Sequence, residues 1–298
     1  METFKPLPDY VLTGDQPVIT HFSHSQLTKP IGLWAFEMLV LGNERRRQIQ
    51  FGVPAEAGGA IHDAVQEIMT NSENVFITDV IETAAGRIRK HKSISEVDDA
   101  KKEYLVDVVD EFIHNGIVAC EEAVGAEIMG ADTEVPILYE PSELDIPIIG
   151  YCDLVTDDHV IELKTKSPRV GPPRKDGSRN VTPVKLPDSP DFSHLMQVAL
   201  YSVATGKKPI LIYFNEDGYK TFSGGNCAQM QESYLQEALG HLLQRAVVRQ
   251  NLLKISTDPN VLVNYMDFDF TDFRWNIGQE FVDEAKQWVY GRFFGGKR

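Results

Sequence analysis

Cysteine is scarce in this chain, and its scarcity excludes two kinds of scaffold. Only three cysteines occur among the 298 residues, Cys120, Cys152 and Cys227, and no two of them form a CxxC pair. A disulfide framework or a structural zinc site needs more cysteines at closer spacing. We therefore expect three free thiols.

Long apolar runs are also missing. A membrane-spanning helix needs about 20 consecutive apolar residues, and the sequence contains no such run. Residues 1–20 carry acids and prolines where a signal peptide needs a basic start and an apolar stretch. We expect an irregular arm at 1–20, no membrane contact and a cytoplasmic location, which would be the host cytoplasm if the protein is viral.

Basic residues are outnumbered by acids. The chain has 29 Lys and Arg against 44 Asp and Glu, and a formal net charge of −15. This balance argues against nucleic-acid binding, because Lys and Arg make most contacts with phosphates. Between Leu163 and Leu186 the balance is reversed, and Asp176 is the single acid among seven basic residues: Lys164, Lys166, Arg169, Arg174, Lys175, Arg179 and Lys185. The segment is either a solvated loop or a phosphate-binding one.

Hydrophobic periodicity predicts helices on both sides of a group of strands. The predicted helices are residues 23–41 with a break near Pro30, 58–70, 77–92, 97–124, 194–205, 229–253 and the end of 267–294. The predicted strands are residues 133–139, 147–156, 159–166, 209–215 and 219–223. We expect the first three strands to be antiparallel, with a tight turn at Asp157-Asp158, and a proline-rich loop at 167–193.

This order of elements is typical of an α/β fold, in which helices flank a central mixed β-sheet and extra helices lie at the N- and C-terminal ends. No repeat or interdomain linker stands out. We expect a single domain over 21–298. Its helical part would cover 21–130, its sheet core 131–223 and its C-terminal helical part 224–298.

One pair of predicted strands carries charged residues in an apolar setting. Asp153 and Glu162 lie on the two strands of the predicted hairpin, and Glu162 and Lys164, two apart, point to the same face. Two carboxylates and a strand carbonyl, that of Leu163, are ligands that Mg²⁺ accepts. Lys164 could position a water or stabilise charge on a phosphate. A surface Glu–Lys pair is the alternative, and a pattern this short does not exclude it.

Three flanking patterns favour the chemical interpretation. His62 ends the GxxH pattern Gly59-Ala60-Ile61-His62, which we place at the opening of a helix. Asp153 ends the sequence Gly-Tyr-Cys-Asp, and Gln197 and Tyr201 form a QxxxY pattern one helical turn apart. Each pattern is weak alone, but their order along the chain is specific.

Together these patterns resemble the PD-(D/E)XK nuclease superfamily, in its branch of RecB-like and Cas4-like exonucleases, phage-type members included. The resemblance covers about residues 20–215 and implies a restriction-endonuclease-like core. It implies that His62, Asp153, Glu162 and the Leu163 carbonyl bind Mg²⁺ or Mn²⁺. Lys164, Glu162 and Asp153 would be the catalytic residues.

The resemblance also implies how DNA is held. Gln197 and Tyr201 would contact the DNA backbone or brace the site. The basic residues that follow the strand of Glu162 and Lys164 would grip phosphates; they are Arg169, Arg174, Lys175 and Arg179. Phe192, Phe273 or Trp275 could stack bases, although core packing is the favoured interpretation of the last two.

Two departures limit the resemblance. Cas4-like members hold an iron–sulfur cluster with four cysteines, and this chain has Lys29-Pro30 where the first cysteine is expected and only Cys227 late in the sequence. We therefore expect no iron–sulfur cluster. The motif aspartate follows Cys152 instead of a proline.

The implied function is a metal-dependent exonuclease that hydrolyses phosphodiester bonds at the ends of linear single- or double-stranded DNA, in recombination, repair or replication. A recombinase or a single-strand-binding protein would be its partner, and homo-oligomerisation stays open. Three alternatives remain: a structure-specific or restriction-like endonuclease, a catalytically silent nucleic-acid-binding protein, and a helical interaction protein whose motifs are coincidental.

Overall fold

The computed structural model describes residues 19–70 and 76–294 and divides into two compact units. The first unit comprises residues up to 50, 138–150 and the chain from 240 onward; the second comprises 51–137 and 151–239. Apart from Ile19 and Thr20, the arm expected at 1–20 lies outside the described residues. No helix in the described part of the chain is long and apolar enough to cross a membrane.

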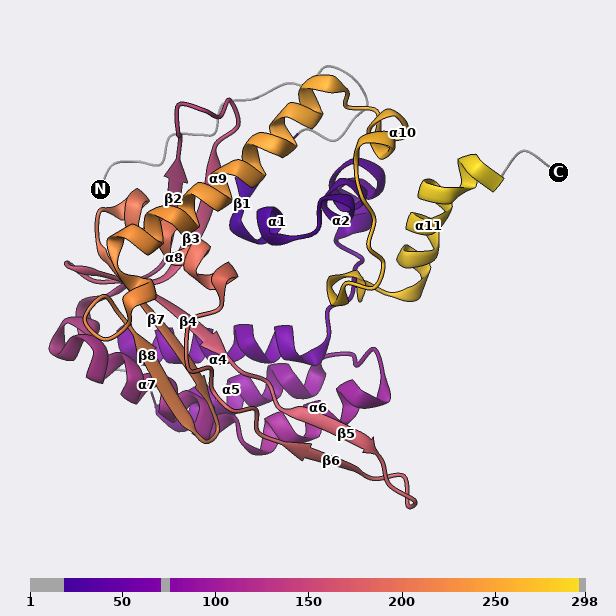
Figure 1. Ribbon diagram of the computed structural model, residues 1–298. Coiled ribbons are helices and arrows are strands. Elements are labelled where there is room, and N and C mark those ends of the chain that lie inside the picture. Colours follow the sequence, from indigo (N-terminus) through magenta and orange to yellow (C-terminus); the bar gives the residue numbers. More distant parts are fainter. Residues whose placement is uncertain (1–18, 71–75, 295–298) are drawn as a thin grey trace. The chain divides into compact units, whose positions relative to one another are not determined.

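Helices make up much of the second unit (Figure 1). They are α4 (Val53–Thr70), α5 (Ile77–Lys90), α6 (Glu96–Asp107), α7 (Val109–Val124) and α8 (Phe192–Thr205). The single helix expected over 97–124 is wrong, because Val108 leaves helical geometry at φ −119° and ends α6. His62 does not open its helix either, since α4 already begins at Val53.

The sheet of the second unit mixes parallel and antiparallel pairs. Its strands are β4 (His159–Thr165), β7 (Lys208–Asn215), β8 (Gly218–Phe222) and the parts of β2 (Asp132–Tyr139) and β3 (Ile148–Val155) that cover residues 132–137 and 151–155. The pairs β3–β4 and β7–β8 are antiparallel, β4–β7 is parallel, and β2 pairs with β3. The predicted hairpin and the mixed sheet flanked by helices are confirmed.

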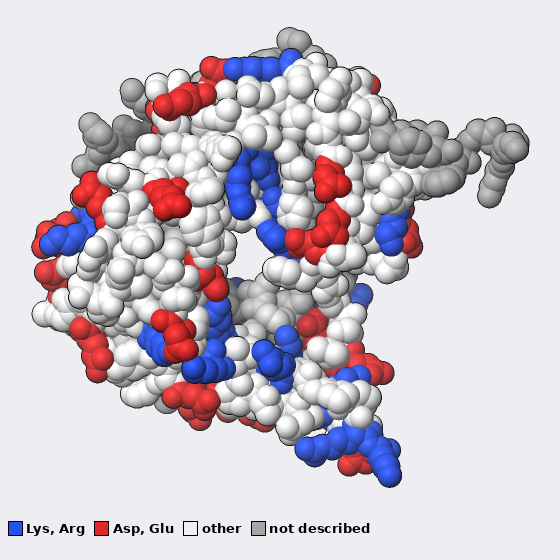
Figure 2. All heavy atoms as spheres, viewed as in Figure 1, with Lys and Arg blue, Asp and Glu red and all other residues white. Residues whose placement is uncertain are grey.

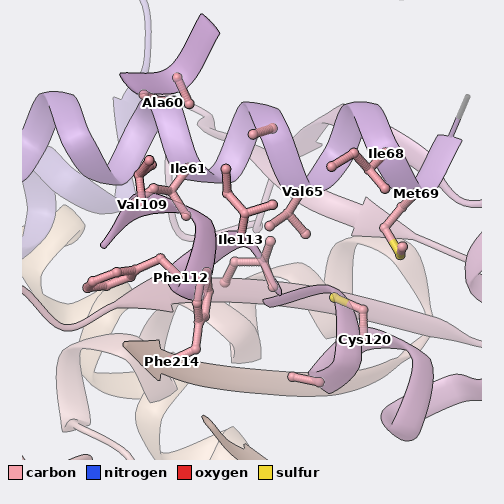
Figure 3. Packing of buried hydrophobic residues seen from close by; sticks show 14 of the residues in the cluster. Ala60, Ile61, Val65, Ile68, Met69, Val109, Phe112, Ile113, Cys120 and Phe214 are labelled. Carbon is pink, nitrogen blue, oxygen red and sulfur yellow. The ribbon is translucent and has the colours of Figure 1, made fainter. Parts of the chain in front are cut away.

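The two faces of β4 differ in chemistry. Ile161 and Leu163 belong to a buried apolar cluster with α4, α7 and β7. Figure 3 shows side chains of α4, Ile61 and Val65 among them, directed toward Phe112 and Ile113 of α7. The alternating residues of β4, including Glu162 and Lys164, therefore point to the opposite face, where α8 packs on β4 and β7.

The proline-rich segment expected to be a loop contains two strands, which corrects that prediction. β5 (Arg169–Pro173) and β6 (Arg179–Thr182) form an antiparallel ribbon. Gly177, at φ +85°, allows the turn at its tip. The ribbon packs on α6, so a neighbouring helix holds it.

The first unit begins with short elements: β1 (Phe22–Ser23), α1 (His24–Thr28), α2 (Ile31–Ala35), a π-helix (Phe36–Leu41) and α3 (Gly42–Arg46). Ser23 and Gln26 form a capping box for α1, and the chain breaks at Pro30 as predicted. α10 (Pro259–Leu262), α11 (Gln279–Phe294) and most of α9 (Glu232–Ile255) complete this unit.

An aromatic core stabilises the first unit. Trp275 is 3% exposed and packs against Phe36 with ring centroids 6.0 Å apart, so its expected core role is confirmed. Phe273 is 81% exposed, and core packing was wrong for this residue.

Candidate metal and nucleic-acid site

Asp153 is placed where β3 and β4 stop pairing. The last paired residues are Leu154 with Ile161 and Val155 with Val160. Beyond them, the Leu163 N–H donates to Asp153 Oδ2 at 2.7 Å. The carboxylate therefore accepts the hydrogen bond that a backbone carbonyl of β3 would accept if the two strands went on pairing. This bond fixes Asp153 against β4.

The Leu163 carbonyl lies on the same side. The Lys166 N–H donates to the Phe214 carbonyl of β7, and backbone groups alternate direction along a strand. Leu163 lies three residues before Lys166, so its backbone N–H and C=O point to the other side of the strand, toward β3. Because the N–H and C=O of one strand residue share an edge, the carbonyl faces the side occupied by Asp153, as the predicted ligand role requires.

Glu162 and Lys164 form a buried pair. The Lys164 ammonium donates to Glu162 Oε1, and Glu162 is 2% exposed. The second carboxylate oxygen, Oε2, is also buried and has no hydrogen-bond partner. An unpartnered carboxylate oxygen in the protein interior is costly unless a cation satisfies it.

Burial and nearby charges shift the pKa values of Glu162, Asp153 and Lys164. Burial, and then the charge of Asp153, raise the pKa of Glu162 to about 8. Burial likewise raises the pKa of Asp153 to about 6, against the opposing charge of Lys164. Burial alone would lower the pKa of Lys164, but the two carboxylates outweigh it and the pKa is raised. Lys164 therefore stays charged beside acids that hold their protons more tightly than usual.

His62 reaches the site from α4. Its Nδ1 lies 3.8 Å from Asp153 Oδ2, and its ring centroid lies 6.1 Å from that of Phe214. Burial, and then the charge of Lys164, lower the pKa of His62 to about 4. The imidazole is thus neutral at pH 7, the form that binds metals, and its buried Nε2 has no hydrogen-bond partner.

Two residues of the site were missed by sequence reasoning. Gln66 is 5% exposed and donates to the Asp153 carbonyl at 2.9 Å and to Glu134 Oε1 at 3.1 Å. Glu134 adopts a left-handed conformation with φ +48°, which is uncommon for a residue with a side chain. Gln66 follows His62 by one helical turn, which was a usable signal. Nothing in the sequence marks Glu134.

The carboxylates and the backbone carbonyl match the preferences of a hard divalent cation, and the neutral imidazole adds a nitrogen donor of the kind that transition-metal ions accept. Within residues 19–70 and 76–294, no three His, Cys, Asp or Glu side chains lie close enough together to hold an ion as they are placed. The Glu162 carboxylate is bound to Lys164 instead. His62, Asp153, Glu162 and Lys164 are brought together, but not in a finished coordination sphere.

Gln197 and Tyr201 share one face of α8, as predicted. The Gln197 amide donates to the Tyr201 hydroxyl at 2.9 Å, and Tyr201 is 3% exposed. Burial, and then the charge of Glu162, raise the pKa of the Tyr201 hydroxyl. Because the hydroxyl is buried near Glu162, the geometry favours the bracing role for this pair over direct contact with DNA.

The predicted phosphate-gripping residues all lie on the ribbon, and Figure 2 shows Lys and Arg gathered at its tip. Arg169, Arg174 and Lys175 are exposed. Arg179 differs, since its guanidinium pairs with Glu96 of α6 at 3.0 Å and donates to the Gly171 carbonyl. Arg179 therefore secures the ribbon to α6.

No protein-family model and no curated protein matches the chain. Among solved structures, the crystal structure of the protein designated SSO0001 is similar over 57% of this chain and 87% of its own, with 18% sequence identity and a TM-score of 0.24. A likeness at that TM-score carries no argument about fold or activity.

Proposed function

We propose that this chain is a divalent-metal-dependent deoxyribonuclease that hydrolyses phosphodiester bonds at the ends of linear DNA, and that its second unit is a restriction-endonuclease-like core. The observation that carries the proposal is the group formed by the buried Glu162 and the partly buried His62, Asp153 and Lys164. Structural ion pairs rarely leave a buried carboxylate oxygen and a buried imidazole nitrogen without partners, as Glu162 Oε2 and His62 Nε2 are here.

The residues fit Mg²⁺ or Mn²⁺ by the chemistry of their donor atoms. Asp153, Glu162 and the Leu163 carbonyl would supply oxygen ligands and His62 a neutral nitrogen. A bound divalent cation supplies Lewis acidity toward a phosphodiester and lowers the pKa of water. It would also offset the repulsion between two acids whose pKa values are raised in its absence.

The remaining residues have roles of their own. Lys164, held as a cation by two carboxylates, is suited to stabilise negative charge that develops on a phosphate. Gln66 donates a hydrogen bond to the Asp153 carbonyl and would hold that backbone in place. Tyr201 and Gln197, which are bonded to each other, would brace the site from α8. Arg174 and Lys175 on the exposed ribbon would attract DNA to an otherwise acidic protein.

The test is incubation of the purified protein with end-labelled linear DNA in Mg²⁺ or Mn²⁺, beside two variants. Lys164→Ala removes the proposed catalytic lysine. Lys90→Ala removes an exposed lysine at the end of α5 and is the matched control. We expect metal-dependent degradation by the wild type and by Lys90→Ala, with a loss of at least about a hundredfold in Lys164→Ala.

Closed circular DNA in the same assay separates the alternatives. Survival of the circle while linear DNA is degraded supports an exonuclease. Cutting of the circle favours a structure-specific or restriction-like endonuclease. If no substrate, single- or double-stranded, is degraded with either metal, the nuclease proposal fails and a silent binding protein replaces it.

A further inference from the structure

A second basic site lies wholly within the first unit. A pocket of about 430 Å³ is bordered by the junction of α1 and α2, by α9 and by the turn before Trp275. Four of its lining residues carry positive charge: Lys29, Arg245, Arg249 and Arg274. Neither the sequence motifs nor the proposed nuclease site uses them.

Two of these charges are neutralised locally. Lys29 is paired with the buried Glu37. Arg274 pairs with Asp272 through Nε at 2.9 Å and Nη2 at 2.8 Å. Asp272, which also lines the pocket, pairs with Arg274, and in the described part of the chain it lies within 4.0 Å of neither Arg245 nor Arg249.

Arg249 is different, because it is buried without a counter-charge. It is 3% exposed, and its guanidinium lies over the Trp34 ring at 5.3 Å. It donates only to carbonyls, those of Lys29 at 2.7 Å, Arg245 at 3.1 Å and Gln26 at 3.4 Å, and its Nε has no partner. In the part of the chain that the structure describes, no carboxylate lies within 4.0 Å of Arg249 or Arg245.

The cluster is electrostatically unfavourable as it stands. Burial, and then the charge of Arg245, lower the pKa of Arg249 to about 10. Burial, and then the charge of Arg274, lower the pKa of Arg245. A buried cation beside a like charge is tolerated where an anion balances it, and guanidinium groups bind phosphate through paired N–H donors.

We propose that this pocket binds a phosphate group, with Arg249 at its base and Arg245 at its rim. The phosphate would belong either to the backbone of a nucleic-acid strand or to a free phosphate compound. A purely structural role for Arg249 explains its Nη2, which donates to carbonyls at the end of α1, and its Nη1, which donates to the Arg245 carbonyl of α9. It does not explain the unpartnered Nε, and Arg245 makes only a long bond of 3.5 Å to the Leu27 carbonyl while its side chain is exposed beside the pocket.

The experiment is a calorimetric titration of the full chain with inorganic phosphate in EDTA, so that the result is independent of nuclease activity. Arg245→Gln removes an exposed guanidinium of the pocket, and Arg89→Gln removes an exposed one from α5 in the second unit. We expect Arg245→Gln to weaken phosphate binding about tenfold or more and Arg89→Gln to leave it unchanged.

A second variant distinguishes a loss of phosphate binding from a loss of folding. Gln244→Glu places a carboxylate on an exposed residue that lines the pocket. We expect it to raise the melting temperature, by supplying the missing counter-charge, while also weakening phosphate binding. No measurable binding of phosphate by the wild type, or equal binding by wild type and Arg245→Gln, overturns the proposal.

The source of the phosphate is decided by a parallel titration with a single-stranded oligonucleotide that lacks terminal phosphates. If inorganic phosphate competes with the oligonucleotide and Arg245→Gln weakens both, the pocket takes strand phosphates. If only inorganic phosphate is affected, it takes a free phosphate compound. Both outcomes support a phosphate site.

Discussion

The Leu163 N–H and the Asp153 carboxylate are joined by a 2.7 Å hydrogen bond that takes the place of a strand-to-strand contact. This arrangement sets an acid beside Glu162 at the open end of the hairpin, and after burial the charge of that acid is the next cause of the raised pKa of Glu162.

Gln66 is expected to matter as a support of this acid. Gln66→Ala removes donors to the Asp153 carbonyl and to Glu134, and we expect a loss of about 1–3 kcal/mol in the free energy of unfolding, because a buried acceptor loses its partner. Urea unfolding measures it. Gln236→Ala, which breaks an exposed bond to Glu232 on α9, is the control and should cost under about 0.5 kcal/mol. Equal effects of the two variants would show that Gln66 does not support Asp153.

The metal-free site predicts a pH dependence. The pKa of Glu162 is raised to about 8 and that of Asp153 to about 6, both above their ordinary values. Groups of this kind contribute stability that is present at low pH and is lost as pH rises through the folded-state pKa. We expect Glu162→Gln, which cannot ionise, to gain stability relative to the wild type between about pH 5 and pH 8.

Unfolding midpoints in EDTA across that pH range test the expectation. Glu237→Gln, on the exposed side of α9, should follow the wild type throughout. Parallel curves for wild type and Glu162→Gln would contradict a raised pKa at Glu162. Added Mn²⁺ should raise the wild-type midpoint most at the upper end of the range, where both acids are ionised, and should have much less effect on Glu162→Gln.

What could be predicted from the sequence was mainly what local periodicity determines. Glu162 and Lys164 share a face because they are two apart on a strand, and Gln197 meets Tyr201 because they are four apart on a helix. The approach of His62 to Asp153 depends on how α4 crosses the sheet. There the order of the motifs and the family resemblance, more than spacing, suggested the contact.

Other features depend on long-range packing that has no local signature. Pro172 and Pro173 cannot donate backbone hydrogen bonds in a sheet, and for that reason the sequence predicts a loop where the structure has β5. The pairing of β5 with β6 and its contact with α6 offset the missing hydrogen bonds. Glu134 enters the site through an uncommon backbone conformation. Phe273 is expected in the core only because it is aromatic, and the short turn that contains it leaves its side chain exposed.

Replacing a glycine by alanine is expected to have opposite effects on stability at two helical positions, because α7 packs closely on α4 and β7 and α5 leaves open space at its glycine. A Cβ on Gly116 would lie 2.8 Å from Val65 Cγ2 and 3.0 Å from Phe214, so Gly116→Ala should destabilise by about 1–3 kcal/mol. Gly86 lies within α5, and a Cβ there would meet nothing within 4 Å. Gly86→Ala should stabilise by up to about 1 kcal/mol. Chemical denaturation of both variants checks the pair, and a neutral Gly116→Ala would mean that α7 does not pack this closely.

Contact between the ribbon and DNA can be tested by comparing its exposed basic residues with the one that is already paired with an acid. Arg174 and Lys175 are exposed, whereas Arg179 is paired with Glu96. If the tip contacts phosphates, replacing Arg174 and Lys175 together by Ala should weaken binding to all DNA sequences alike. It should also reduce the slope of log affinity against log salt by about 2, since each phosphate contact contributes about 0.9.

Arg179→Ala is the matched variant, because it lies on the same ribbon and also removes one positive charge. It should change the salt slope little, while it lowers stability by releasing Glu96 and the Gly171 carbonyl. Fluorescence anisotropy with labelled DNA in EDTA measures both variants without cleavage. If Arg179→Ala reduces the slope by about 0.9, as the loss of one phosphate contact would, the Glu96 pair opens for DNA. If neither variant changes it, DNA does not follow the ribbon, and the basic residues serve only to keep an exposed strand pair in water.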